Sequence, residues 1–180
     1  LNKEKISPPK PRARTLFVLV HRLDDASKKL GRAFKLVANF DNVVLWVVGD
    51  GPSREDYVKE VKKLKIEDRV VFVGSKINPY PYMKKGDYLI LTSLYEGFPV
   101  VYLEGLALKK KLITTIKVSD DYLKIGKNYG EVIPSNEMKM LEKVKEILNS
   151  KKKTDTFLDL EEIQNVRMEK LETIFDGGDF

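Results

Sequence analysis

Short apolar runs alternate with amphipathic segments along most of the chain. The runs are rich in β-branched residues and predict buried strands, at 16–20, 43–48, 69–73, 88–92, 112–115 and 131–133. The segments between them predict helices, at 27–39, 53–64 (capped by Ser53), 99–108, 120–125 and 137–148, and a short irregular or helical piece at 79–85. Strands that alternate with helices and are apolar on both faces belong to a parallel sheet covered on both sides. The pattern therefore predicts an α/β fold with a Rossmann-like, doubly wound parallel sheet.

The two ends of the chain differ from this middle part. Residues 1–14 are rich in proline, lysine and arginine and have no apolar periodicity, which is typical of a linker or tail. A lysine run opens residues 151–180, and apolar residues at helical spacing behind it predict a terminal helix. We therefore expect one domain, residues 15–150, between a linker and a terminal helix.

Composition narrows the possible functions. Hydrophobic residues make up 42% and charged residues 33% of the 180 residues, as in soluble globular domains. The sequence has no cysteine and one histidine, His21, which excludes a disulfide framework, a thiolate metal site and a multi-histidine metal site. The apolar runs are far shorter than the about 20 residues of a membrane-spanning helix, and no segment has the pattern of a signal peptide. We therefore expect a cytoplasmic protein.

The formal net charge is +6. A basic excess favours anionic partners, which are a phosphate ligand, an acidic membrane surface or a nucleic acid. Lysines that only keep the surface solvated explain the excess equally well. The chain contains neither the G-x-G-x-x-G fingerprint of dinucleotide-binding dehydrogenases nor a P-loop, so we exclude these two classes.

The segment from Ser93 to Glu104 carries the most informative chemistry. It starts where a predicted strand ends, and open parallel sheets bind ligands at that edge. Gly97 allows a ligand close to the backbone, and Pro99 suits the first turn of a helix, whose free N–H groups attract a diphosphate. The helical rise separates Glu96 and Glu104 by about 10 Å. The acid and base of a retaining glycosidase lie about 5–5.5 Å apart, so this pair instead suits the two ends of one elongated ligand.

The spacing of Glu96 and Glu104 resembles the E-x7-E signature of the retaining family-4-type glycosyltransferases, the glycosyl transferases group 1. The resemblance covers about residues 16–148. It implies one half of a GT-B fold, the nucleotide-sugar-binding C-terminal half. In this family the position of Glu96 lies at the donor sugar and that of Glu104 holds the ribose hydroxyls. The resemblance also implies donor contacts from the residues between them: Gly97, Phe98, Pro99 and Val100.

Arg22 follows the first predicted strand, and Lys28 follows Arg22 by six residues, as in the same family. The resemblance implies that both neutralise the diphosphate of the donor. Physically, a guanidinium and an ammonium suit a leaving group that gains negative charge. Donor contacts are further implied for Gly51, in the turn after the second strand, and for Ser75 and Lys76 beside the base. An ordinary tight turn explains Gly51 equally well.

The chain departs from the family pattern in two places. Lys109, Lys110 and Lys111 stand where the family has a Gly-Pro-like turn before the fifth strand. His21 stands where a small residue usually precedes the arginine, and it is expected to narrow the phosphate site. Neither departure changes the E-x7-E pattern of Glu96 and Glu104.

These features together predict retaining transfer of a hexose from a nucleotide diphosphate sugar, with UDP favoured, to a glycan or lipid-linked acceptor in polysaccharide biosynthesis. We expect no cofactor and no metal, since Arg22 and Lys28 supply the positive charge. The expected partners are the donor, an N-terminal acceptor-binding domain of the same protein, and a peripheral contact at the inner face of the membrane. The fragment alone is expected to be inactive.

Two alternative functions stay open at this point. The first is a non-catalytic module that binds nucleotide sugars without transferring them. The second is a nucleic-acid-binding domain, which only the basic charge suggests. Because the sequence contains no recognised nucleic-acid-binding module, we expect no nucleic-acid partner.

Overall fold

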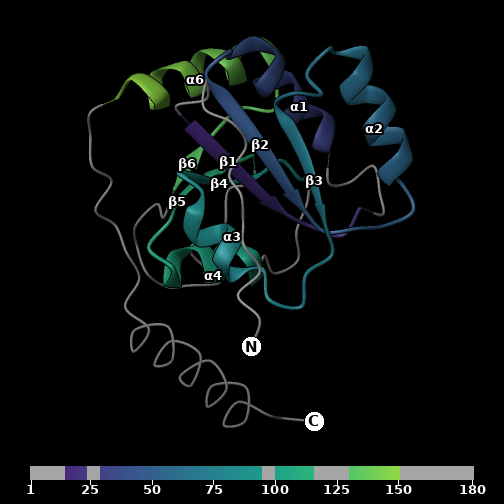
Figure 1. Ribbon diagram of the computed structural model, residues 1–180. Helices are drawn as coiled ribbons and strands as arrows, with labels where there is room; N and C mark the ends of the chain where they lie inside the picture. Colours follow the sequence, from purple (N-terminus) through teal and green to yellow (C-terminus); the bar gives the residue numbers. More distant parts are fainter. Residues whose placement is uncertain (1–14, 24–28, 95–99, 116–129, 151–180) are drawn as a thin grey trace, which may run out of the picture.

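Six parallel strands form one sheet in the order β3-β2-β1-β4-β5-β6 (Figure 1). The computed structural model describes residues 15–23, 29–94, 100–115 and 130–150, and every structural statement below concerns these residues. The strand order reverses direction between β1 and β4, as in doubly wound folds. The strands are β1 (Thr15–Val20), β2 (Val43–Val48), β3 (Val70–Gly74), β4 (Tyr88–Leu91), β5 (Lys111–Thr114) and β6 (Glu131–Val132).

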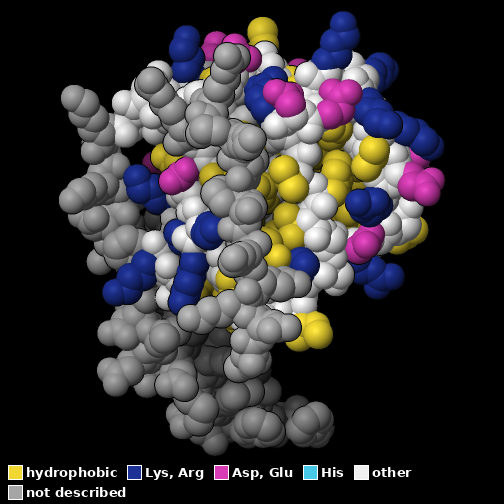
Figure 2. Space-filling model, viewed as in Figure 1, with side chains coloured by type: hydrophobic (Ala, Val, Ile, Leu, Met, Phe, Trp, Pro, Cys, Tyr) yellow, Lys and Arg dark blue, Asp and Glu magenta, His cyan; other side chains and the backbone are white. Residues whose placement is uncertain are grey.

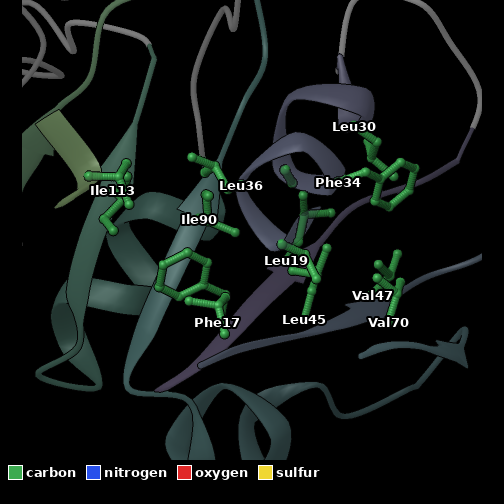
Figure 3. Packing of buried hydrophobic residues seen from close by; sticks show 14 of the residues in the cluster. Phe17, Leu19, Leu30, Phe34, Leu36, Leu45, Val47, Val70, Ile90 and Ile113 are labelled. Atoms are coloured by element: carbon green, nitrogen blue, oxygen red, sulfur yellow. The ribbon is translucent and has the colours of Figure 1, made fainter. Parts of the chain in front are cut away.

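Helices α1, α2 and α6 cover one face of the sheet (Figure 1). Strand side chains such as Phe17, Leu45 and Ile90 point to this face and belong to one buried cluster with Phe34 of α1 (Figure 3). Each fully buried side chain of this size contributes about 1.5–3 kcal/mol through the apolar surface that it removes from water. The three helices are α1 (Leu30–Asn39), α2 (Arg54–Lys63) and α6 (Glu137–Asn149).

Helices α3 (Tyr80–Lys85) and α4 (Val100–Ala107) cover the opposite face. Successive strand residues point to opposite faces of a sheet. Leu45 of β2 therefore belongs to the first buried cluster, and its neighbour Trp46 belongs to a second buried cluster on the opposite face. The Trp46 and Tyr82 rings meet edge to face, with their centroids 5.9 Å apart. Both faces of the sheet are therefore covered, which confirms the predicted α/β architecture.

The predicted elements have the right type and order but differ at some ends. The first helix, predicted from residue 27, begins at Leu30, because Lys29 has left-handed backbone angles (φ 48°) that a right-handed helix does not contain. Ser53 is the N-cap residue of α2, but the prediction that its side chain caps the helix is wrong. Its side chain forms no capping hydrogen bond, and its backbone N–H donates to the Leu23 carbonyl oxygen at 2.9 Å.

Three predicted segments lie outside the described residues: the linker 1–14, the helix 120–125 and the terminal helix 151–180. The domain boundaries therefore stay a prediction. None of the helices that the structure describes is long and apolar enough to cross a membrane.

The surface combines charges of both signs. In the view of Figure 2, Asp and Glu side chains lie among Lys and Arg side chains on the upper part of the molecule, beside a band of hydrophobic side chains. Lys35 of α1 forms an ion pair with Glu137 of α6, and Lys59 pairs with Asp56 within α2. Exposed pairs of this kind contribute little to stability, so the two buried clusters hold the fold together.

Candidate functional site

A crevice of about 440 Å³ opens at the carboxyl edge of the sheet. It lies where β1, β2 and β3 end, beside the point at which the strand order reverses, and α4 contributes to its wall. Open α/β sheets bind their ligands at this place, and ligand pockets commonly measure about 300–1,000 Å³. The lining residues are Val20, His21, Arg22, Val48, Gly49, Asp50, Ser75, Lys76, Pro79 and Val101.

The turn after β2 holds the end of β1 in place. The His21 N–H donates to the Val48 carbonyl oxygen at 3.0 Å. Gly49 has a φ of 143°, and a Cβ atom on it would lie 1.8 Å from the His21 carbonyl oxygen. Only glycine fits this conformation and this close approach. The contact fixes the backbone that carries Arg22, whose side chain lines the crevice and is exposed.

Gly51 lies against the backbone of Leu23 and does not line the crevice. A Cβ atom on Gly51 would lie 2.4 Å from the Leu23 carbonyl oxygen. The Leu23 N–H donates to the Asp50 carbonyl oxygen at 3.0 Å, so the turn and the segment after β1 are bonded together. The structure thus gives Gly51 a role in the turn, and its contact with a donor stays a prediction.

Ser75 and Lys76, which we predict to lie beside the nucleotide base, both line the crevice after the end of β3. Lys76 Nζ lies 5.7 Å from the centre of the Tyr82 ring, a cation–π contact that restrains the ammonium group. The lining thus contains two basic residues, Arg22 and Lys76, and one acidic residue, Asp50. Its charge favours an anionic ligand.

Hydrogen bonds tie the end of β4 to its neighbours. His21 Nε2 and Ser93 Oγ lie 3.3 Å apart, and Ser93 is completely buried. The Thr115 hydroxyl donates to the Ser93 carbonyl oxygen at 2.6 Å. The Arg32 guanidinium donates to the Thr92 carbonyl oxygen at 3.1 Å. These bonds fix the backbone after β4 close to the crevice.

Glu104 of α4 is bound by a tyrosine of α3. The Tyr80 hydroxyl donates to Glu104 Oε1 at 3.0 Å. This hydrogen bond, and then the charge of the carboxylate, raise the pKa of Tyr80, because both favour the protonated phenol. Val101, which lines the crevice, precedes Glu104 by three residues, so the two side chains share one side of the helix. Val100 is 54% exposed and does not line the crevice.

The remaining predicted site residues, Lys28, Glu96, Gly97, Phe98 and Pro99, lie outside the described residues. Of the site residues that the structure does describe, it brings Arg22, Ser75 and Lys76 together in one crevice. Glu104 lies beside this crevice, on the same side of α4 as a lining residue.

Sequence reasoning missed several residues of the site. Gly49 and Asp50 directly follow a predicted strand, and this position alone indicates that they belong to the ligand-binding edge. Val101 could have been found from its helical spacing to Glu104. The bond from Tyr80 to Glu104 joins positions 24 residues apart, and no local pattern in the sequence indicates it.

The sheet order and the crevice define a Rossmann-like, doubly wound α/β domain with a ligand site at the carboxyl edge of its sheet. The apo form of the lipopolysaccharide outer core galactosyltransferase WaaB has a similar fold, with a TM-score of 0.68 at 23% identity, over 91% of this chain and 52% of WaaB. Anabaena Alr3699/HepE, solved in complex with UDP and glucose, has a TM-score of 0.71 at 20% identity, over 90% of this chain and 48% of HepE.

The chain belongs to the glycosyl transferases group 1 family, whose model matches residues 2–158. It is 35% identical over 81 residues to the lipopolysaccharide core biosynthesis glycosyltransferase LpsD of Rhizobium meliloti (strain 1021), which is 45% of this chain and 24% of LpsD. It is 32% identical over 71 residues to N-acetylgalactosamine-N,N'-diacetylbacillosaminyl-diphospho-undecaprenol 4-alpha-N-acetylgalactosaminyltransferase of Campylobacter jejuni, which is 39% of this chain and 20% of that protein. The chain thus spans about a quarter of its curated relatives and about half of the similar solved structures.

Proposed function

We propose that this chain is the donor-binding half of a retaining glycosyltransferase. The enzyme transfers a sugar from a nucleotide diphosphate sugar to the hydroxyl of a glycan or lipid-linked acceptor. The observation that carries the proposal is the crevice at the carboxyl edge of the sheet, lined by Arg22 and Lys76 beside α4. HepE, which has a similar fold, is solved with UDP and glucose, and UDP is therefore the favoured nucleotide.

Arg22 and Lys28 stabilise the diphosphate as it leaves the sugar. The leaving group gains negative charge when the glycosidic bond to it breaks, and fixed cations lower the energy of that state. A guanidinium donates two parallel hydrogen bonds to phosphate oxygens, whereas an ammonium acts as a point charge. The position of Arg22 in the crevice supports this role.

The segment around the two glutamates binds the other parts of the donor. Glu96 and the backbone N–H groups of Gly97 and Phe98, with Pro99 and Val100, position the sugar. Glu104 accepts hydrogen bonds from the ribose hydroxyls. Ser75, Lys76 and Gly51 contact the nucleotide from the strand ends on the other side. The place of Glu104 beside the crevice supports this arrangement.

The acceptor binds to a second half of the protein that faces the crevice. The chain covers about half of the similar solved structures, and the proposal assigns the other half to an N-terminal domain. This half alone therefore binds donor but transfers almost no sugar. The Campylobacter relative is named for a diphospho-undecaprenol acceptor, which supports a lipid-linked acceptor. A cytoplasmic enzyme with peripheral contact at the inner face of the membrane, attracted there by its net charge of +6, suits such an acceptor.

A thermal-shift titration of this chain tests the proposal. A ligand that binds only the folded state at 100 times its Kd stabilises that state by about 2.7 kcal/mol. For a domain of this size the melting temperature then rises by roughly 5–10 °C. We expect this rise with UDP and a UDP-sugar, and a much smaller one with uridine, which lacks the diphosphate. Absence of a rise with UDP-, GDP- and ADP-sugars alike would refute the proposed donor site.

A further inference from the structure

Tyr80 lies outside the E-x7-E segment but contacts its second acid. Its hydroxyl donates to Glu104 Oε1 at 3.0 Å, between the first residue of α3 and the middle of α4. Pro79, the preceding residue, lines the crevice. The contact therefore lies at the border of the crevice, where α3 and α4 approach each other.

The helices that carry the two partners of this bond are both anchored by buried side chains next to them in the sequence. Tyr82 and Met83 anchor α3 in the second buried cluster, and Tyr102 and Leu106 anchor α4 in the same cluster. The start of α3 is fixed further, because the Tyr80 N–H donates to the side-chain oxygen of the residue two positions before it, at 3.1 Å. Packing thus sets the distance between the two helices, across which the exposed Tyr80 side chain reaches the carboxylate.

We propose that Tyr80 is a positioning residue for nucleotide recognition, whose hydroxyl holds the Glu104 carboxylate in the orientation that accepts the ribose hydroxyls. This inference rests on the proposed function. An ionised carboxylate offers about four lone-pair sites, so one bond from Tyr80 leaves sites for both hydroxyls of the ribose. A glutamate that is already ordered loses less side-chain entropy when the nucleotide binds.

The protonation state of the Tyr80 phenol agrees with this role. Glu104 raises the pKa of Tyr80 from its ordinary value, which is already about 10. The phenol therefore keeps its proton at neutral pH and acts only as a donor toward the carboxylate. Free and nucleotide-bound chains can keep the same contact, because the bond uses only one of the sites on Glu104.

Calorimetric titration with UDP and with 2′,3′-dideoxyuridine diphosphate, which lacks both ribose hydroxyls, tests the inference. Tyr80→Phe should weaken binding of UDP by roughly three- to tenfold. This is less than the roughly ten- to a hundredfold expected for loss of a direct hydrogen bond between a charged group and the ligand, because Tyr80 acts on the nucleotide only through Glu104. The substitution should leave binding of the dideoxy nucleotide unchanged. In a Glu104→Ala background, which removes the acceptor, Tyr80→Phe should have little further effect on UDP, because the two residues act through one contact. Tyr88→Phe removes a hydroxyl at the start of β4, on the opposite edge of the sheet, and serves as the matched control.

Each other outcome overturns the inference. Equal losses with both nucleotides, or a loss that persists beside Glu104→Ala, would mean that Tyr80 acts through the fold and not through the ribose. Tighter binding of UDP by Tyr80→Phe would mean that the hydroxyl competes with the ribose for Glu104. If Glu104→Ala weakens UDP binding and Tyr80→Phe does not, the positioning role fails while the proposed function stands. If wild-type protein binds none of UDP, GDP and ADP, the proposed function itself fails, and the inference with it.

Discussion

Gly51 lies so close to Leu23 that a Cβ atom on the glycine would stand 2.4 Å from the Leu23 carbonyl oxygen and 2.6 Å from its carbonyl carbon. These neighbours are backbone atoms, which cannot rotate away as the end of a side chain can. The turn after β2 and the segment after β1 are therefore locked together one residue beyond Arg22. The geometry of the crevice depends on this contact.

Gly51→Ala should destabilise the fold. The added methyl group forces the two backbone segments apart, and overpacking of this kind costs about 1–3 kcal/mol. Chemical denaturation measures the loss as a lower midpoint at an unchanged slope. Gly31→Ala is the matched control, because its new methyl group would meet only the carboxylate end of Glu60, at 2.6 Å, which can move aside. Its stability should equal or exceed that of the wild type, since alanine favours a helix by up to about 1 kcal/mol. Equal losses from both substitutions would contradict this account of the turn.

Lys109→Gly should stabilise the protein. Lys109 follows α4 with a φ of 56°, in the left-handed region that glycine adopts without strain after a helix. Relief of the strain should raise the free energy of unfolding by about 0.5–1 kcal/mol. This value is net of the loss that comes from the greater freedom of glycine in the unfolded chain. Thermal unfolding measures this as a higher melting temperature.

Lys110→Gly is the control for this prediction. The Lys110 ammonium donates to the Gly86 carbonyl oxygen at 2.9 Å, and Lys110 has no positive φ. The same replacement one residue later should therefore destabilise the fold, because it removes a hydrogen bond and adds backbone freedom without relieving strain. A loss of stability from Lys109→Gly as well would contradict the assignment of strain to Lys109.

Arg22→Gln should weaken nucleoside diphosphate binding without unfolding the chain. Arg22 lines the crevice and is exposed, and substitutions at exposed positions usually change stability little. Loss of a charged hydrogen-bond donor to phosphate typically lowers affinity by roughly ten- to a hundredfold. Calorimetric titration with UDP measures the change, and Lys62→Gln, at an exposed position in the last turn of α2, controls for net charge. If Lys62→Gln weakened UDP binding as much, only the overall charge of the chain would matter.

Much of the fold could be predicted from the sequence because both faces of the strands are buried. Strand β2 is apolar at every position, without alternation, and such a run indicates a strand that is buried on both faces. In the structure every residue of β2 is buried. The start of α1 was predicted too early, because the apolar spacing says nothing about the left-handed angles of Lys29. The capping role of the Ser53 side chain was also wrong, since Ser53 has backbone angles (φ −83°, ψ 4°) outside the extended region from which a side chain usually caps a helix.

The site could be predicted only in part. Arg22 and Lys76 follow strands directly, and the carboxyl edge of a parallel sheet brings such positions together. The packing of Gly51 on Leu23 depends on how the segments after β1 and β2 meet in space. The spacing of residues along the chain does not indicate this arrangement. The bond between Tyr80 and Glu104 depends in the same way on how α3 and α4 pack on the sheet.

The most direct test of the proposed donor site is calorimetric titration of the Glu104→Ala and Glu96→Ala chains with UDP. Glu104→Ala should weaken UDP binding by roughly ten- to a hundredfold, because it removes a charged acceptor from the ribose hydroxyls. Glu96→Ala should leave UDP binding unchanged, because its expected partner is the sugar, which UDP lacks. Glu142→Ala, at an exposed position of α6, gives the baseline for loss of an acidic residue. Equal and negligible effects of Glu104→Ala and Glu96→Ala, in a chain that binds UDP, would contradict the account.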